Sequence, residues 1–325
     1  MIHSRNTPLL AVALAAALAA CGREAPQPAA PQAPAATEGA PATAVAEAAS
    51  HDFAIGGLQA TALKNGGLTV PNDNSVFGVG LTPDEVAGVL SAARLPTDAL
   101  HLSVQPLLVR DGGRVMLFDT GAGRFMGEGA GRLGAALQAA GVEPAQVTDV
   151  FISHAHGDHV GGLLDAQGAL AFPNATVHIS QTEWEDLQAQ AEGPDEWAAK
   201  VAAAVVPAVA SKLSTFAPDA ELVPGLVRAV PTPGHTPGHV SFRIGRDAQT
   251  LLYVGDVVHH PVVSVQRPQW TLQWDRDAAA GAAQRTRLLE ELAGSGERVY
   301  AVHFPFPGLG RIRRGADGQL AWVAE

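Results

Sequence analysis

Short apolar runs, separated by glycine, proline and charged turns, alternate along the chain from about residue 51 to residue 325. Runs of strand length that are rich in Val, Ile and Leu predict strands at 104–109, 115–118, 150–152, 176–179, 226–230, 250–254 and 298–302. Helical patterns and caps predict helices at 132–140, 181–190, 195–213 with a break at Pro207, and 278–292. The chain is therefore expected to mix helices and strands.

Two turn signals add detail to this pattern. Asn65-Gly66-Gly67 lies between apolar runs and predicts a hairpin over 53–70. Thr82-Pro83-Asp84-Glu85 predicts the start of a helix, because its capping threonine, first-turn proline and following glutamate form a capping box.

The order of these elements is neither a regular strand-helix-strand series nor all-strand, which favours a layered α+β sandwich over a barrel. The chain has 325 residues, of which 47% are hydrophobic, and this is enough to bury a sizeable core. No linker interrupts the pattern after residue 50, so residues 51–325 are expected to form one domain.

The first 50 residues have a different composition. Residues 1–20 carry a basic start and an apolar stretch too short to span a membrane, which predicts a signal peptide. Residues 21–50 are mostly Ala, Pro, Glu, Thr and Gln, which predicts an extended tether with little to bury. The chain is therefore expected to be exported.

Leu18-Ala19-Ala20-Cys21 resembles a bacterial lipobox. The resemblance implies cleavage before Cys21, lipidation of its sulfur and a membrane anchor facing the periplasm. Gly22 stands where an inner-membrane retention signal usually has Asp, so the outer membrane is the expected destination. The alternative is an ordinary secretory peptide with an incidental cysteine.

The net charge and the cysteine content limit the ligands and the metal donors that are expected for this protein. The 32 acidic and 21 basic residues give a net charge of −11, which opposes binding to nucleic-acid phosphates. Cys21 is the only cysteine, so no intramolecular disulfide can form. Any metal in the mature domain must be held by nitrogen and oxygen donors.

Metal-capable residues follow four of the predicted strands. The strand at 150–152 leads into His154-Ala155-His156-Gly157-Asp158-His159, and the other three lead to His235, Asp256 and His303. In an extended or turning segment the first two histidines of the run can share one metal, while the Asp-His pair can serve a second. Five histidines and two aspartates exceed the needs of one tetrahedral ion, so two metals are expected.

This set of motifs resembles the signature of metallo-β-lactamase-fold hydrolases. The motifs occur in family order: Asp119-Thr120-Gly121, the run from His154 to His159, Gly234-His235-Thr236-Pro237-Gly238-His239, Gly255-Asp256 and His303. The resemblance implies an αββα sandwich from about residue 53 onward. It places His154, His156 and His235 on one metal and Asp158, His159 and His303 on the other, with Asp256 bridging both.

The resemblance also implies a mechanism and its cofactors. Two divalent cations, with zinc expected and cobalt, manganese and iron as alternatives, would hold a bridging hydroxide that attacks the substrate. Asp158 and Asp256 are the expected catalytic carboxylates, and Asp158 can serve as a proton donor or as a ligand alone. Asp119 is expected to orient a ligand histidine, His239 to be structural, and His259 and His260 to lie in a solvated loop.

Three segments outside the ligands, 170–177, 219–225 and 303–312, resemble the methyl parathion hydrolase group with its related lactonases and arylesterases. The resemblance implies a pocket for a small-molecule lactone, aryl ester or organophosphate triester, lined by Trp184, Phe304, Phe306 and Phe125. Related hydrolases are often dimers, so a homodimer is one of the assemblies open to this chain.

Other branches of the fold are weighed against this one. A β-lactamase would have Cys at the place of Asp256 or lack the bridging aspartate. A thioesterase of the glyoxalase II type would have a longer region after His303. The remaining alternatives are an iron-dependent sulfur dioxygenase and a non-catalytic binding protein whose metal site has decayed, and metal analysis would separate these.

Overall fold

The computed structural model describes residues 49–325, which form one compact unit. The predicted signal peptide, Cys21 and the predicted tether up to residue 48 lie outside the described residues. Within the described part, no helix is long and apolar enough to cross a membrane.

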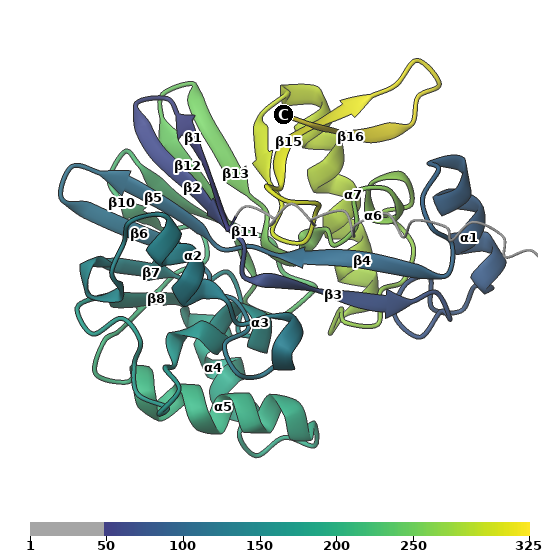
Figure 1. Ribbon diagram of the computed structural model, residues 1–325. Coiled ribbons are helices and arrows are strands. Elements are labelled where there is room, and N and C mark those ends of the chain that lie inside the picture. The colour runs from purple at the N-terminus through teal and green to yellow at the C-terminus, as the bar shows by residue number, and fades with distance from the viewer. Residues whose placement is uncertain (1–48) are drawn as a thin grey trace, which may run out of the picture. The chain divides into compact units, whose positions relative to one another are not determined.

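Most strands of the described region belong to two seven-stranded sheets (Figure 1). The first sheet has the order β1 (Ser50–Ile55), β2 (Leu58–Leu63), β5 (Leu107–Asp111), β6 (Arg114–Phe118), β7 (Asp149–Phe151), β8 (Thr176–Ser180) and β9 (Leu213–Phe216). Its pairs are antiparallel from β1 to β6 and parallel from β6 to β9.

The second sheet has the order β10 (Glu221–Val223), β11 (Val227–Pro231), β12 (Val240–Arg246), β13 (Gln249–Tyr253), β14 (Arg298–Tyr300), β15 (Leu309–Arg314) and β16 (Leu320–Ala324). Only the β13–β14 pair in it is parallel. Its parallel connection runs through the long helix α7 (Ala278–Ser295), as such a crossover requires.

Helices cover the outer faces of the two sheets. On the first sheet, α2 (Leu133–Ala139), α4 (Gln181–Gln190) and α5 (Glu196–Val209) bury an apolar cluster against its strands. On the second, α7 packs against β15 and closes another cluster. Shorter helices are α3 (Gly157–Val160), α6 (Val263–Gln266) and the 3₁₀ turns η1 (Gly127–Gly129), η2 (Pro144–Gln146), η3 (Gly161–Leu163) and η4 (Gly255–Val257). The predicted αββα sandwich is confirmed.

A smaller unit extends from the sandwich beside α6. It consists of the antiparallel pair β3 (Gly66–Pro71) and β4 (Ala99–Val104) with helix α1 (Pro83–Ala92) between them in the chain (Figure 1). An apolar cluster joins α1, both strands and Val263 of α6. Helix α1 begins with the predicted capping box of Thr82 and Glu85.

The prediction of a hairpin over 53–70 is wrong about the position of the turn. The hairpin is β1–β2, and it turns at Gly56 and Gly57, where Gly56 has a φ of 57°. Asn65 is buried instead of exposed at a turn, and its Oδ1 accepts hydrogen bonds from the backbone N–H groups of Ala122 and Gly131, each at 3.1 Å. Asn65 therefore forms hydrogen bonds with residues remote in the chain, and the turn predicted at this position does not form.

Two other boundaries differ from the prediction. The strand predicted at 104–109 is divided between β4 and β5, because Gln105 turns into the core and donates to the carbonyls of Ala301 and Phe304 at 2.9 Å. Helix α5 contains Pro207 without a break. Pro207 lies near the helix end and is exposed, so the carbonyl that loses its partner can bind water.

The inner faces of the two sheets meet in an aromatic core. Phe242 of β12 is wholly buried, and its ring centroid lies 5.4 Å from that of Phe118 and 5.9 Å from that of Phe151, both in the first sheet. Contacts of this kind stabilise the sandwich beyond the burial of area alone.

Phe242→Ala should lower the free energy of unfolding by about 3–5 kcal/mol, because it removes a buried ring from between two sheets that cannot collapse into the cavity. Urea denaturation followed by circular dichroism measures this. Val323→Ala on β16 is the control, since Val323 is 51% exposed and should change stability by less than about 0.5 kcal/mol. Equal stability of the two variants would contradict the proposed role of this core.

Candidate metal centre

The seven predicted metal ligands come together beyond one end of both sheets. His154 follows β7, and His156 is the N-cap of α3, which carries Asp158 and His159. The other three ligands lie after strands of the second sheet: His235 after β11, Asp256 in η4 after β13, and His303 after β14. The ends of strands in both sheets therefore position short loops, and these loops bring the predicted ligands to one site.

Three imidazoles and one carboxylate oxygen form the first cluster. Nδ1 of His156 lies 3.1 Å from Nε2 of His154 and 2.9 Å from Nε2 of His235. Oδ2 of Asp256 lies 3.6 Å from Nε2 of His154 and 3.3 Å from Nε2 of His235. Ligands of one tetrahedral ion at about 2.0–2.1 Å are spaced in this range.

The second cluster uses the other oxygen of the same carboxylate. Oδ1 of Asp256 lies 3.1 Å from Nε2 of His159 and 3.1 Å from Nε2 of His303. Oδ2 of Asp158 lies 3.6 Å from each of the same two nitrogens. Asp256 thus lies between the two clusters, with Oδ1 nearest to the second cluster and Oδ2, which is also 3.3 Å from Nε2 of His303, toward the first.

The buried polar atoms inside the clusters are suited to binding cations. Nε2 of His159 and Oδ1 of Asp256 are buried and have no hydrogen-bond partner in the described structure. Burial favours a neutral acid, yet the imidazoles of His159 and His303 hold the pKa of Asp256 well below its usual value. A buried carboxylate among converging nitrogen atoms needs positive charge beside it, and nitrogen and oxygen donors suit divalent first-row metals.

Hydrogen bonds on the outer side set the tautomers of the ligand histidines. Nδ1 of His159 donates to Oδ2 of Asp119 at 2.7 Å, and Nδ1 of His303 donates to the carbonyl of Ser103 at 2.7 Å. Nδ1 of His154 donates to Oγ of Ser153 at 3.1 Å, because this hydroxyl itself donates to Asp119. The Nε2 lone pair of each ring is therefore left for a metal.

Asp119 has the orienting role predicted for it. Besides His159, its carboxylate accepts hydrogen bonds from the backbone N–H and hydroxyl of Ser153 and from the hydroxyl of Tyr253, at 2.7–2.8 Å. Asp119 is fully buried and has a φ of 54°. This strained backbone at the end of β6 turns the carboxylate beneath the metal loop.

The family is decided by the match of residues 102–303 to the metallo-beta-lactamase superfamily model. The chain belongs to the metallo-beta-lactamase superfamily. The matched span contains all seven residues of the two clusters and also Asp119, which supports His159.

Among curated proteins, an N-acyl homoserine lactonase of a Bacillus species is 35% identical over 108 residues, which is 33% of this chain and 37% of the relative. A Bacillus subtilis relative matches over 44% of its own length. The chain thus spans less than half of the curated relatives that it matches.

Two solved structures of the superfamily are similar over most of the described region. One is the dizinc quorum-quenching lactonase AidC in complex with the product N-hexanoyl-L-homoserine, with 28% identity, a TM-score of 0.78, and coverage of 86% of this chain and 99% of that one. The other is the hydrolase AbOPH, with 27% identity, a TM-score of 0.77, and coverage of 86% and 98%.

A second outer carboxylate, absent from the sequence prediction, supports His235 in this superfamily site. Nδ1 of His235 lies 3.1 Å from Oδ1 of Asp275, and the guanidinium of Arg285 donates to Oδ2 of Asp275 at 2.8 Å. Burial raises the pKa of Asp275 to about 6, and Arg285 opposes this rise. The sequence offers no local signal for this pair, because Asp275 lies 40 residues after His235.

Three further histidines lie near the clusters, and the structure confirms the prediction for one of them. His239 is structural, as predicted: its Nε2 accepts from the backbone N–H of Asp256 at 2.9 Å. His259 does not lie in a solvated loop: it is fully buried, its Nε2 is 3.0 Å from Oδ2 of Asp256, and its ring stacks on His303 at 11°. His260 is also buried, and its Nδ1 accepts from the backbone N–H of Val263 at 3.2 Å. Ser264 of the following helix α6 accepts hydrogen bonds from the backbone N–H groups of His259 and His260, at 3.3 and 3.1 Å.

A cavity of about 520 Å³ opens over the two clusters. Its lining includes Leu68 of β3, Met126, Trp197 and Trp274 beside ligands from both clusters. None of the four predicted pocket aromatics lines it within the described residues. Trp184 and Phe304 are buried in apolar clusters, and Phe125 and Phe306 pack partly buried against others. These rings pack between the layers of the fold. The residues next to each ring in the sequence do not reveal that packing.

Glu183 of α4 connects the two loops that carry the first cluster. Its carboxylate is 1% exposed, and Oε1 accepts from the backbone N–H of Ala155 at 2.8 Å. Oε2 accepts from the hydroxyl of Thr236 at 2.7 Å and from the N–H of Gly238 at 3.0 Å. Burial raises the pKa of Glu183 to about 7 although these donors oppose the rise. The carboxylate thus fixes the spacing of His154, His156 and His235.

Glu183→Gln should weaken metal binding about tenfold or more, because an amide N–H₂ must then face a backbone or hydroxyl donor and the two loops separate. Competition for zinc with a chromogenic chelator measures the affinity of the first cluster. Glu185→Gln on the exposed side of the same helix is the control and should leave that affinity unchanged. Equal zinc retention by both variants would show that Glu183 does not position the loops.

Proposed function

We propose that this protein is a di-metal hydrolase that opens lactones, with zinc as the expected ion in both clusters. The observation that carries the proposal is the carboxylate of Asp256, which lies between the two sets of donor atoms, with Oδ2 toward the first set and Oδ1 nearest to the second. Similarity to the dizinc lactonase AidC over 86% of this chain supports the choice of metal and of reaction.

His154, His156 and His235 would hold one ion, and Asp158, His159 and His303 the other. Two such cations polarise a carbonyl and make water a nucleophile at neutral pH. In the net reaction, water adds its oxygen to the acyl carbon, the ring C–O bond breaks, and a hydroxy acid leaves. No oxidant or further reactant is required.

Two carboxylates of the chain would have separate roles in this reaction. Asp158 lines the cavity, and its side chain is 15% exposed. We assign it the transfer of a proton from the attacking water to the ring oxygen that leaves. Asp256 is 5% exposed at its side chain and lies between all the donor atoms, so its role is to hold the two clusters together.

Metal content and a substrate panel test this proposal on residues 49–325. The panel contains an acyl-homoserine lactone, an aryl ester, a phosphotriester, a β-lactam and a glutathione thioester. About two zinc ions per chain with lactone turnover is the expected result, and aryl-ester or phosphotriester turnover would extend the substrate range. Thioester or β-lactam turnover alone would overturn the substrate assignment, iron with oxygen consumption would indicate a dioxygenase, and a protein without metal would be a binding protein.

His154→Ala and Asp256→Ala should each lower lactone turnover by about a thousandfold or more, because each removes a donor from the metal centre that stabilises the transition-state charge. Circular dichroism should show a retained fold, since His154 lies in a loop and Asp256 in the short turn η4, both beyond the strand ends. Full activity of either variant would rule out a two-metal reaction.

We further propose that the chain is a lipoprotein anchored through Cys21 to the outer membrane and facing the periplasm. The lipobox-like segment before Cys21 supports this. Cys21→Ser should move the protein from the membrane fraction to the periplasmic fraction of a bacterial host, because the thioether to the lipid cannot form. Membrane fractionation followed by immunoblotting measures this, and unchanged distribution would contradict the lipid anchor.

A further inference from the structure

The chain has two tyrosines, Tyr253 at the end of β13 and Tyr300 at the end of β14, and both are fully buried. They are partners across these parallel strands, and their rings stack at a centroid distance of 5.6 Å and an angle of 13°. Phe53 of the first sheet stacks on Tyr300 at 6.2 Å, and Phe118 contacts the ring of Tyr253 at 6.0 Å. Close packing in this core therefore fixes the direction of each hydroxyl.

The two hydroxyls have different partners. The hydroxyl of Tyr253 donates to Oδ2 of Asp119 at 2.7 Å. The hydroxyl of Tyr300 donates instead to the backbone carbonyls of Gln105 and Pro106, at 3.2 and 3.3 Å. Of the two tyrosines, only Tyr253 therefore reaches a side chain that supports a metal ligand.

Tyr253 stays a hydrogen-bond donor because it keeps its proton. Burial, and then the carboxylate of Asp119, raise the pKa of Tyr253 well above its usual value. A phenol that remains protonated beside a carboxylate forms a charge-assisted hydrogen bond, which is stronger than a bond between neutral groups.

Oδ2 of Asp119 receives donors from both sheets. The hydroxyl of Ser153 and Nδ1 of His159 each lie 2.7 Å from it, and these residues follow β7 of the first sheet. The hydroxyl of Tyr253 reaches the same oxygen from the second sheet. The position of this oxygen is therefore fixed across the sandwich and not only within one layer.

The strand that carries Tyr253 also leads to a metal ligand. Tyr253 ends β13, and Asp256 follows it three residues later in η4. Oδ1 of Asp256 lies 3.1 Å from Nε2 of His159. The bond from Tyr253 to Asp119 therefore connects the segment of Asp256 to the carboxylate that holds His159.

We propose that Tyr253 is a positioning residue for the second metal cluster: its hydroxyl fixes Asp119, and Asp119 in turn sets His159 against Asp256. The inference rests on the two-metal site of the proposed function, but it does not depend on which substrate is opened. Tyr253 acts through Asp119 and does not line the metal cavity.

The test compares Tyr253→Phe with Tyr300→Phe in the zinc-loaded protein. Each substitution removes one buried hydroxyl and keeps the stacked ring, so a general loosening of the core would affect both variants. Tyr253→Phe should give up one of its two zinc ions to a chromogenic chelator about tenfold or more readily than the native protein, because His159 loses its fixed support. Tyr300→Phe should stay within twofold of the native protein, and equal zinc retention by both variants would overturn the proposal.

Fluorine NMR provides a second measurement that keeps both hydroxyls. Labelling with 3-fluorotyrosine gives two signals, which Tyr300→Phe assigns. Exchange of zinc for the larger ion cadmium should shift the signal of Tyr253 more than that of Tyr300, because only Tyr253 is hydrogen-bonded to the support of His159. Two unchanged signals, or equal shifts of both, would contradict the positioning role. This result is decisive even if Tyr253→Phe does not fold.

Lactone turnover separates this proposal from the proposed function. If the native protein opens no lactone but Tyr253→Phe releases zinc more readily than Tyr300→Phe, the positioning role stands and the lactonase function falls. If lactones are opened and both variants retain zinc equally, the positioning role falls alone. With both correct, Tyr253→Phe should lose turnover at limiting zinc and recover it when zinc is in excess.

Discussion

The convergence of buried donor atoms around Asp256 is the constraint on which the site depends. One carboxylate faces imidazole nitrogens on both of its sides, and the histidine and aspartate atoms of the two clusters lie within 3.6 Å of it or of one another. Bringing so many polar atoms out of water without partners is unfavourable. Cations in both clusters would supply the missing interaction, so the site and its metals are expected to form together.

The sandwich holds this arrangement by placing it at the ends of strands and then tying the loops to the core. Asp119 ends β6 and joins the metal loop to Tyr253 of the other sheet. Glu183 joins the loop of His156 to that of His235 from a helix on the outer layer. Each support comes from a buried carboxylate, and each crosses between segments that are remote in the chain. The loops can therefore be short and irregular without being free to spread.

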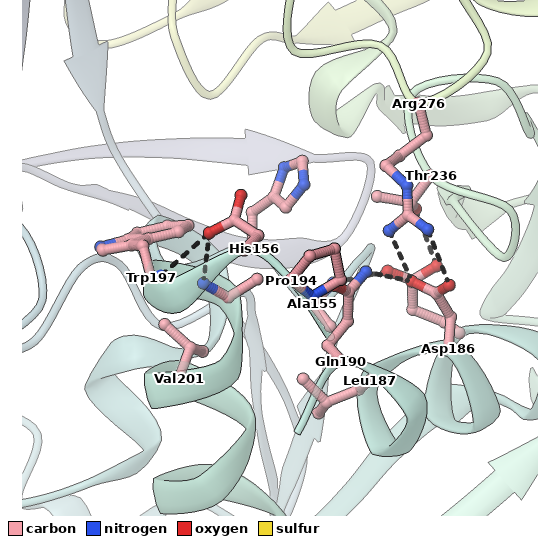
Figure 2. A pocket seen from close by; sticks show the side chains of 13 residues that line it. Ala155, His156, Asp186, Leu187, Gln190, Pro194, Trp197, Val201, Thr236 and Arg276 are labelled. Atoms are coloured by element: carbon pink, nitrogen blue, oxygen red, sulfur yellow. Dashed lines mark hydrogen bonds and ion pairs between the residues drawn. The ribbon is translucent and has the colours of Figure 1, made fainter. Parts of the chain in front are cut away.

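Polar and apolar side chains both surround the metal centre. Leu68 of β3 and Trp197 of α5 line the metal cavity beside ligands from both clusters, and Arg276 in the same lining is paired with Asp186 of α4 (Figure 2). Trp197 packs against Gly157 of the metal loop, where a Cβ would lie 2.6 Å from its ring, so its position depends on that glycine.

The sequence by itself determined a layered α+β sandwich, the capping of α1 and the histidines and aspartates expected to bind two metals, because these depend on local spacing: a strand end, a short turn and a histidine or aspartate directly after it. The αββα arrangement and the division of the ligands between two clusters were implied by the resemblance to metallo-β-lactamase-fold hydrolases. Apart from the predicted support by Asp119, only the tertiary structure decided what supports and surrounds these residues. Glu183, Asp275 and Trp197 reach the site from separate elements, whereas Trp184 and Phe304 are turned into the core. The burial of a side chain depends on how layers pack, and that packing is a property of the whole chain rather than of any motif in it.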